Sequence, residues 1–457
     1  MRTTIVVDLG FGDAGKGLLT DFLARHLKAG LVVRYNGGAQ AGHNVVAPDG
    51  RHHTFAQFGA GTFVPGVRTY LSRFMVVHPG ALLVEGDHLL RQGVPDAFAR
   101  LRLSDQALVI TPFHQAANRI RELARGAHRH GSCGAGVGEA VEDAQLHPSV
   151  RLLAGDLAHP SGLPRKLRAI RERERARVAP LCQGQSLGSP IAREWAFFED
   201  DALIDAWIAS IARISDLGLV ASDVLLQRWM DETESVIFEG AQGVLLDADA
   251  GFHPFTTWSN ATAAQALELI SEMAPGSPVC KLGVLRSYAV RHGPGPLPTE
   301  TDALAASVHE HNQPNDWQGG VRYGWFDAVL ARYALAVTGG VDALAITHLD
   351  LLDRLKSWQY CPAYTGWYGF DDSSVEIAAS AGLLTGFRLP PSLPLAQRER
   401  FTQILSALTP QLASCAPDEA SVLPIIAALL GQPVDIVSRG PSAQDVQILN
   451  SFPASFT

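Results

Sequence analysis

Cysteine is scarce in this sequence, and the positions of the few cysteines exclude two classes of small protein. Only five of the 457 residues are cysteine, and no two of them form a CxxC pair. They are Cys133, Cys182, Cys280, Cys361 and Cys415. A zinc ribbon needs clustered cysteine ligands, and a disulfide scaffold needs a dense set of cysteines. The count excludes both and favours a reducing compartment.

Long apolar stretches are also missing. No uninterrupted apolar run reaches the roughly 18 residues that a membrane-spanning helix needs. The N-terminal segment MRTTIVVDLGFGDAGKG has no signal-peptide core followed by a small-residue cleavage site. The sequence therefore predicts a soluble cytoplasmic protein without a membrane partner.

Basic residues are outnumbered by acidic ones. The chain has 37 Lys plus Arg against 46 Asp plus Glu, a net charge of −9. Non-specific binding to DNA or RNA depends on positive charge, so no nucleic-acid partner is expected, although a local basic pocket remains compatible with this balance. Hydrophobic residues make up 47% of the chain, which is enough for a large core. The length predicts about three structural units or one large α/β domain with insertions, and no internal repeat or low-complexity linker divides it.

Short apolar stretches end repeatedly in glycine-rich turns, with helical periodicity between them. This pattern predicts an α/β fold with a large, mostly parallel central sheet and helices on both faces, so that ligands bind at the carboxyl ends of the strands. The expected strands lie in Thr3–Leu9, Leu31–Tyr35, Arg68–Val77, Ser235–Leu246, Val279–Ala289, Ala343–Thr347 and Val434–Val437, and the clearest helices in Leu18–Leu27 and Phe113–His130.

Two further segments have simple interpretations. Residues 165–177 alternate in charge at helical spacing, which is typical of a solvated helix. Residues 385–396 are the most proline-rich stretch and predict a surface loop.

A phosphate-binding loop is the strongest single motif. Residues 10–17, GFGDAGKG, match GxxxxGK between a predicted strand and a predicted helix. Glycines let backbone N–H groups converge on phosphate oxygens, and Lys16 can reach the terminal phosphates. The ordinary loop continues with Ser or Thr to hold Mg²⁺, but Gly17 stands here, so Asp13 is the candidate metal ligand. The alternative is a tight structural turn.

Seven segments together are specific to one known family. They are Gly12–Gly17, RYNGGAQAGHNVV (Arg34–Val46), FEGAQGVLLDADAGFHPFTTWSN (Phe238–Asn260), RHGPGPLPTE (Arg291–Glu300), YGWFDA (Tyr323–Ala328), THLDLLD (Thr347–Asp353) and SRGP (Ser438–Pro441). Through these segments the sequence resembles the adenylosuccinate synthetase family. The matches run in order from residue 3 to about residue 450, so the resemblance covers nearly the whole chain and implies one domain, 1–457, with helical and loop subdomains inserted.

The resemblance implies a GTP-dependent carbon–nitrogen ligase. In the family, the γ-phosphate of GTP phosphorylates the 6-oxygen of IMP, and the amine of aspartate then displaces that phosphate. Asp13 occupies the place of the base that removes a purine proton, and His43 that of the imidazole beside the transferring group. Lys16 and Mg²⁺ would neutralise the phosphoryl charge, with Asp13 and the carbonyl of Gly42 as metal ligands. In isolation, Asp13 would be read as an Asx-turn former and His43 as a structural loop histidine.

The resemblance also implies two nucleotide sites and a homodimer. For an IMP-like substrate, Gln242, Thr257 and Arg322 match family positions, whereas Gln40 replaces an Asn and Cys133 a Thr. The alternative for Gln242 is a buried amide that braces its loop. The expected GTP-binding residues are Gly12, Asp13, Ala14, Gly15, Lys16, Gly17, Gly42, His348, Asp350, Ser438 and Gly440. Asp350 would accept hydrogen bonds from guanine, while His348 replaces a Lys, so ATP remains an alternative donor.

The departures fall mainly on the amino-acid side. The family's TTGRxRxxGW segment is replaced by Asp316–Trp325, DWQGGVRYGW, which keeps only Arg322. In the loop Gly131–Gly138, Ala135 stands where the family has an Arg, and Ala14 replaces a Glu. A dicarboxylate needs bidentate partners, so the aspartate site is weakened.

Three hypotheses follow from these departures. The first is an adenylosuccinate synthetase with a rebuilt aspartate site. The second is a paralogue in a specialised pathway that uses another amine or another nucleotide. The third is a non-catalytic nucleotide-binding regulator, which the presence of both Asp13 and His43 disfavours because binding alone needs neither.

Overall fold

The computed structural model describes residues 1–308, 317–367, 369, 375–380 and 382–450. Asp316, the first residue of the segment with the lost arginines, lies outside them. Among the described residues, ten strands form the central sheet: β1 (Arg2–Asp8), β2 (Leu31–Arg34), β5 (Arg68–Leu71), β7 (Leu101–Ser104), β9 (Val220–Ala221), β10 (Ser235–Glu239), β11 (Val279–Arg286), β15 (Ala343–Thr347), β20 (Ile436–Ser438) and β21 (Val446–Ile448). Their order is β21-β20-β15-β11-β1-β10-β2-β5-β7-β9. All neighbours are parallel except β20 and β21, which confirms the predicted α/β class.

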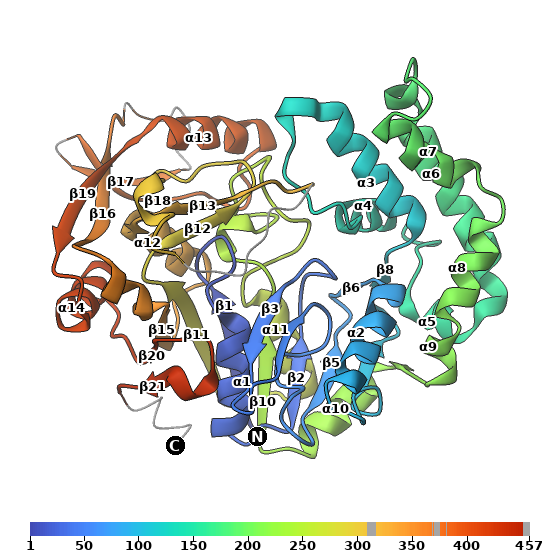
Figure 1. Ribbon diagram of the computed structural model, residues 1–457, viewed down its shortest axis with the longest axis horizontal. Helices are drawn as coiled ribbons and strands as arrows, with labels where there is room; N and C mark the ends of the chain where they lie inside the picture. The colour runs from blue at the N-terminus through green and yellow to red at the C-terminus, as the bar shows by residue number, and fades with distance from the viewer. Residues whose placement is uncertain (309–316, 368, 370–374, 381, 451–457) are drawn as a thin grey trace.

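Strand β1 lies inside this sheet, between β10 and β11 (Figure 1). Six of its seven residues are buried, because a parallel strand is covered on both faces. It leads through residues 10–15 into α1 (Lys16–His26). The loop with the GxxxxGK motif therefore lies at the carboxyl end of a central strand, as the sequence predicts.

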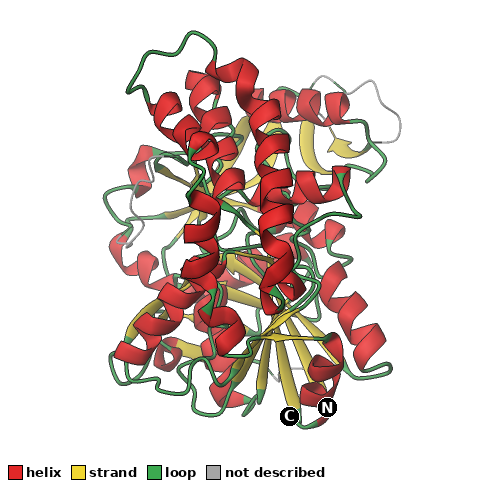
Figure 2. Ribbon diagram, turned by 90° about the vertical axis from the view of Figure 1, so that its right-hand side faces the viewer, coloured by secondary structure: helices red, strands yellow, loops and turns green. Residues whose placement is uncertain are grey.

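A helical region packs on one side of the sheet, on the right in Figure 1 and facing the viewer in Figure 2. It has its own apolar core, which extends to α2 (Pro79–Arg91). Its helices are α3 (Pro112–Arg125), α4 (Val137–Leu146), α5 (Ala154–Ala158), α6 (Leu163–Cys182), α7 (Pro190–Glu199), α8 (Leu203–Ile211) and α9 (Arg213–Asp216).

A second sheet lies on the opposite side of the molecule (Figure 1). It contains β14 (Phe326–Asp327), β16 (Trp358–Thr365), β17 (Glu376–Ser380), β18 (Leu383–Arg388) and β19 (Thr409–Cys415). The remaining helices are α10 (Asp223–Asp231), α11 (Ala264–Met273), α12 (Ala328–Val337), α13 (Leu395–Ala407) and α14 (Glu419–Leu430).

Three short strand pairs complete the fold, and two of them lie at the loops of interest. They are β3 (His43–Val46) with β4 (His52–Phe55), β12 (Ala289–His292) with β13 (Val321–Gly324), and β6 (Val76–Val77) with β8 (Leu108–Val109).

One local prediction was confirmed in part and one was wrong. Residues 165–177 are helical as predicted and mostly exposed or half-buried, while Leu167, Ile170 and Glu174 are fully buried where α6 packs on the helical region. Residues 385–396 are not a loop throughout, because β18 extends to Arg388 and α13 begins at Leu395. Leu389 and Leu393 between them are buried in the main core, which the proline content concealed.

Among the described residues, no helix is long and apolar enough to cross a membrane.

Candidate functional site

The glycine-rich loop of residues 10–17, hereafter the first loop, has the backbone conformation of an anion-binding turn. Gly12 and Gly15 have φ of 97° and 93°, and Asp13 has φ of 57°. Gly15 precedes the first residue of α1, so the loop delivers the N-terminus of that helix to the carboxyl end of β1. The loop also packs directly on the chain after β10, because a Cβ at Gly243 would lie 2.2 Å from the Gly10 carbonyl oxygen.

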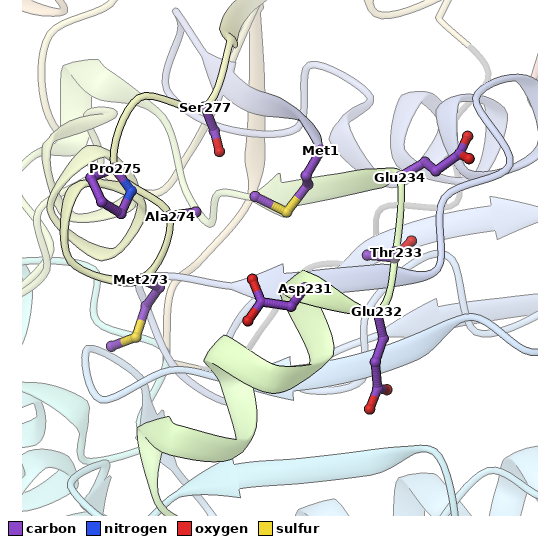
Figure 3. Close-up of a pocket in the computed structure, with 9 residues that line it drawn as sticks. All are labelled: Met1, Asp231, Glu232, Thr233, Glu234, Met273, Ala274, Pro275 and Ser277. Atoms are coloured by element: carbon purple, nitrogen blue, oxygen red, sulfur yellow. The ribbon is translucent and has the colours of Figure 1, made fainter.

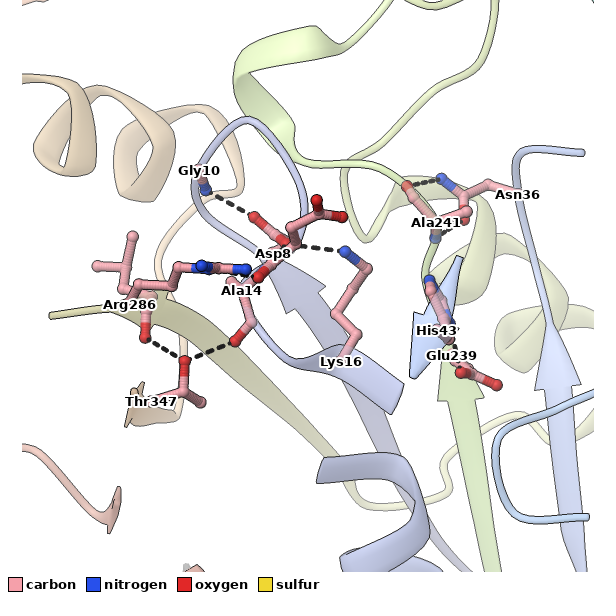
Figure 4. Close-up of polar contacts among 12 residues, drawn as sticks. Asp8, Gly10, Ala14, Lys16, Asn36, His43, Glu239, Ala241, Arg286 and Thr347 are labelled. Atoms are coloured by element: carbon pink, nitrogen blue, oxygen red, sulfur yellow. Dashed lines mark hydrogen bonds and ion pairs between the residues drawn. The ribbon is translucent and has the colours of Figure 1, made fainter. Parts of the chain in front are cut away.

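Asp8, the last residue of β1, is a functional residue that the sequence analysis missed. Its buried carboxylate accepts hydrogen bonds from the backbone N–H groups of Gly10 and Ala14, each at 2.9 Å (Figure 4). It also accepts one from Lys16 Nζ at 2.8 Å. The lysine predicted to meet phosphate therefore has an internal counter-ion, and phosphate oxygens would have to share this ammonium with Asp8. The available signal was a lone charged residue at the end of a buried strand.

Asp13 is held at its carbonyl and at its carboxylate. Its carbonyl oxygen accepts a hydrogen bond from Arg286 Nε, and its Oδ2 lies 2.6 Å from His292 Nε2. Burial alone would raise the pKa of Asp13, but the hydrogen bond and charge of His292, with Arg286 and Lys16, hold that pKa well below its usual range. The carboxylate is 30% exposed. An ionised, partly exposed carboxylate is suited to bind a cation or to accept a hydrogen bond from an N–H group of a substrate.

His43 is paired with a carboxylate that the sequence analysis quoted only within a motif. His43 Nδ1 lies 2.6 Å from Glu239 Oε1 (Figure 4). Glu239 Oε2 accepts a hydrogen bond from the backbone N–H of Ala60. Burial, followed by the charge of Arg34, lowers the pKa of His43 to about 4. At neutral pH the imidazole is therefore uncharged, and its Nδ1–H donates to Glu239 so that Nε2 is left for another partner. The charge of Arg34 and the hydrogen bond from His43 hold the pKa of buried Glu239 below its usual value, although burial opposes them.

Asp13, Lys16 and His43 belong to one electrostatic cluster. The charge of Lys16 lowers the pKa of both Asp13 and His43. The backbone explains the closeness, because a Cβ at Gly17 would lie only 2.9 Å from the carbonyl carbon and the Cβ of His43. The serine or threonine of an ordinary phosphate loop has no room at this position.

The side chains of Gln40 and Gln242, both predicted for the IMP-like site, lie against the turn at Gly37 and Gly38. A Cβ at Gly37 would lie 2.9 Å from Gln242 Oε1, and one at Gly38 would lie 2.8 Å from Gln40 Oε1. Both Oε1 atoms are buried, and neither has a hydrogen-bond partner within the described part of the chain. A buried carboxamide oxygen without a donor is costly, so both are suited to a ligand that supplies one. Thr257 is near the carbonyl of Leu246, to which its N–H donates at 2.7 Å.

The loop Gly131–Gly138 is anchored from behind by buried polar groups. Gly131 N–H donates to Glu122, and Asn118 Nδ2 bridges Ser132 Oγ and Glu139 Oε1. Cys133 is half-buried, and burial raises the pKa of its thiol, so it is a neutral group at this position. The loop abuts the turn after β12, since a Cβ at Gly131 would lie 2.6 Å from Pro294 Cδ.

Glu139 should make the stability of this region depend on pH. Burial raises its pKa to about 7 from 4.5, so the folded protein binds a proton that the unfolded chain releases between these values. The stabilisation is complete below pH 4.5 and is lost as the pH rises through 7. We expect Glu139→Gln to abolish this dependence, so that the free energy of unfolding of the wild type falls relative to the variant by about 3 kcal/mol across the interval.

Urea unfolding of both proteins at pH 4.5 to 7.5 measures this difference. The same change at exposed Glu172 is the control. Parallel curves for the wild type and Glu139→Gln would contradict the expectation.

The segment with the predicted guanine-side residues His348 and Asp350 begins beside the first loop. Thr347 Oγ1 donates to the Ala14 carbonyl at 2.8 Å. His348 follows at φ of 57°, and its ring meets Tyr288 edge-on at 5.9 Å. Burial, and then the charge of Arg286, holds the pKa of His348 well below its usual value, so the ring is neutral. Asp350 forms an ion pair with Arg354 and keeps a 40% exposed carboxylate.

The loop that contains Ser438 and Gly440, the last of the predicted GTP-binding residues, is held by a hydrogen bond within the loop. Ser438 Oγ donates to the Gly440 carbonyl at 2.8 Å, and Gly440 has no room for a side chain beside Asp445.

Arg322, predicted for the IMP-like site, has partners within the chain itself. It forms a bidentate ion pair with Glu300 and donates to the carbonyls of Gly293 and Gly295 at 3.0 and 2.9 Å. It therefore stabilises the turn after β12. Arg119 on α3 is similarly engaged, by the Gly134 carbonyl, Glu194 and the ring of Trp317.

A large pocket lies away from all of these groups (Figure 3). Its volume is about 540 Å³, and it lies at the amino ends of β1 and β10. It is lined by Met1, Asp231, Glu232, Thr233, Glu234, Met273, Ala274, Pro275 and Ser277. Because ligands of parallel sheets bind at the carboxyl ends of the strands, this pocket is not the candidate site.

Comparisons with known proteins agree with this geometry. The family model for adenylosuccinate synthetase matches residues 5–447. The chain belongs to the adenylosuccinate synthetase family. It is 33% identical to the adenylosuccinate synthetase of Alkalilimnicola ehrlichii, over 98% of each chain, and 34% identical to that of Mycobacterium leprae, over 80% of each.

Solved structures show the same fold. A fully ligated adenylosuccinate synthetase from Plasmodium falciparum has a TM-score of 0.73 at 19% identity and covers 98% of this chain and 100% of its own. A cyanophage S-2L succinoaminodeoxyadenylate synthetase bound to dGMP, with dATP as energy donor, has a TM-score of 0.57 at 19% identity and covers 98% and 95%.

The family is one of carbon–nitrogen ligases that act on purine nucleotides and hydrolyse GTP, and members typically use Mg²⁺ and form cytoplasmic homodimers. Among the described residues, no group of three or more His, Cys, Asp or Glu side chains could hold a metal. The predicted donors are the Asp13 carboxylate and the carbonyl of Gly42, which is an exposed residue. This small oxygen set fits Mg²⁺, which commonly binds one or two carboxylates together with substrate phosphates.

Proposed function

We propose that the chain phosphorylates the 6-oxygen of an IMP-like nucleotide with GTP and then replaces that phosphate with an amine, and that residues 1–457 act as one domain. The observation that carries the proposal is the packing of the first loop, which holds Asp13 and Lys16, against His43, since a Cβ at Gly17 would lie 2.9 Å from the His43 Cβ. A regulator that only bound nucleotide would need neither the Asp13 carboxylate nor the His43 imidazole.

The chemistry has two balanced steps. In the first, Asp13 takes the proton from N1 of the purine, and the N–H electron pair moves into the ring and raises the charge on the 6-oxygen. This oxygen attacks the γ-phosphorus, and the bond from that phosphorus to the bridging oxygen breaks, which releases the nucleoside diphosphate. In the second, the amine nitrogen bonds to C6, the C6–O bond breaks with loss of phosphate, and the nitrogen releases a proton.

Other residues hold the reacting groups. Lys16 and the first-loop N–H groups would bind phosphate oxygens. Neutral His43 carries its one proton on Nδ1, so its Nε2 would accept a hydrogen bond beside the transferring group and would donate only after taking up a proton. Mg²⁺, held by Asp13 and the Gly42 carbonyl, would supply positive charge to the phosphates. Gln40, Gln242, Thr257 and Cys133 would contact the IMP-like substrate, and Asp350, His348, Ser438 and Gly440 the guanine end of GTP, with ATP as the alternative.

The amine acceptor is the least constrained part. Arg322 and Arg119 are both committed to groups of the chain itself, and residues 309–316 contain no Lys or Arg. These observations favour the second hypothesis, in which the acceptor is an amine other than aspartate. We propose a homodimer in the cytoplasm on family membership alone.

The test separates the two half-reactions. GTP labelled with ¹⁸O at the β,γ-bridge is incubated with IMP and Mg²⁺ without an amine, and scrambling of the label into non-bridging positions is expected. Phosphate release is then measured with aspartate and a panel of other amines. Strong turnover with aspartate alone would restore an ordinary adenylosuccinate synthetase, and the absence of both scrambling and turnover would leave the regulator.

A further inference from the structure

His292 and its neighbour join the β12–β13 hairpin to the first loop through two separate contacts. Arg291 is buried, and its guanidinium lies 4.2 Å from the centroid of the Phe11 ring. His292, the next residue, reaches Asp13 with its Nε2. Phe11 and Asp13 both belong to the first loop, so successive residues of β12 contact positions two apart in that loop.

The turn that presents His292 is fixed by two arginines. Arg291 donates to the carbonyls of Pro294, Pro296 and Phe255. Arg322, from β13, donates to those of Gly293 and Gly295. Cationic donors to backbone carbonyls make a turn rigid without a ligand, so His292 is held ready before any substrate arrives.

The bond from His292 to Asp13 fixes the orientation of a carboxylate that would otherwise rotate. A carboxylate only accepts hydrogen bonds, so His292 Nε2 carries the proton and donates it to Oδ2. With the carbonyl of Asp13 bound by Arg286, both the backbone and the side chain of the residue are held. The bond uses one lone pair of Oδ2 and leaves Oδ1 free to face a substrate.

We propose that His292 is a positioning residue that aims Asp13 Oδ1 at the N–H of the substrate base. The inference rests on the proposed function, because it assigns Asp13 the proton. Docking of the hairpin does not need the His292 bond, since Arg291 already packs on Phe11 within the core. The His292 bond acts on the reactive group itself, and its loss leaves the first loop attached but its carboxylate free to turn.

The experiment uses a cycle of four proteins: the wild type, His292→Leu, Asp13→Asn and the double variant. The rate of ¹⁸O scrambling in GTP with IMP is measured for each, together with KM for IMP, GTP affinity and Tm. We expect His292→Leu to lower the scrambling rate about 100-fold, as misplacement of a reacting group does, with KM and GTP affinity changed less than about twofold. In the Asp13→Asn background, the same change should cost nothing more. His292→Gln, which keeps an N–H donor, should recover at least about tenfold.

Each other outcome counts against the proposal. A His292→Leu protein that keeps more than half of the wild-type rate, a cost that persists unchanged in Asp13→Asn, or a Gln variant as slow as Leu with an unchanged Tm would overturn it. A lowered Tm with a raised KM and no rescue would mean that His292 only supports the hairpin. Scrambling absent from the wild type itself would remove the proposed function and this inference together. His128→Leu, at an exposed histidine of the helical region, is the matched control.

Discussion

Changing Asp13 to Asn is expected to lower kcat by at least about 1,000-fold, because the carboxamide cannot accept the purine proton. The variant should fold normally. Asp13 has φ of 57°, and asparagine is among the few residues that tolerate this left-handed conformation. Its Oδ1 can still accept the hydrogen bond from His292. Binding of GTP should weaken by less than about fivefold, because the first-loop N–H groups and Lys16 remain.

Isothermal titration with GTP and steady-state kinetics separate these two effects. Asp49→Asn, which changes an exposed carboxylate on the chain between β3 and β4, is the control. A variant at residue 13 that kept turnover would exclude Asp13 as the base, and one that lost GTP binding would mean that the carboxylate mainly organises the loop.

Gly17→Ser, which restores the hydroxyl of an ordinary phosphate loop, is expected to damage the enzyme. The new Cβ would lie 2.8 Å from the Asn44 carbonyl oxygen and 2.9 Å from the His43 Cβ, so β3 must move. Overpacking of this kind costs about 1–3 kcal/mol of stability, and a displacement of His43 of about 1 Å should cost about 100-fold in kcat.

Thermal unfolding and kcat measure the two costs together. Gly162→Ser, where no atom lies within 4 Å of the added Cβ, is the matched control and should change neither. A lower Mg²⁺ concentration for half-maximal activity in Gly17→Ser, without loss of stability, would contradict this expectation. It would show that β3 can move and that a side chain at residue 17 can bind the metal.

The sequence predicts the strands and the first loop well because both are local. The buried strand Thr3–Leu9, the glycines after it and the helix that follows are adjacent in the chain, and period and turn chemistry act over that range. Strand β1 and helix α1 lie within two residues of the predicted bounds. The roles of site residues far apart in the sequence were predicted from the resemblance to the family.

The contacts of the candidate site could not be predicted in the same way. Asp8 with Lys16, His292 with Asp13, and Arg322 with Glu300 are pairs whose partners are set by the packing of loops and strands. Spacing along the chain gives no direction for a side chain that reaches across a fold. The prediction of a surface loop at residues 385–396 was wrong for a related reason. Leu389 and Leu393 are buried by the main core and not by their neighbours in sequence.

The place of β1 in the sheet has a consequence for synthesis on the ribosome. The strand pairs with β10 from Ser235 and with β11 from Val279. Its apolar residues are translated long before those of its neighbours, because more than two hundred further residues must follow before either neighbour exists. Until then the nascent chain carries an apolar strand without its sheet partners. A chaperone that binds this strand during synthesis should therefore raise the yield of folded protein more than one that acts on the finished polypeptide.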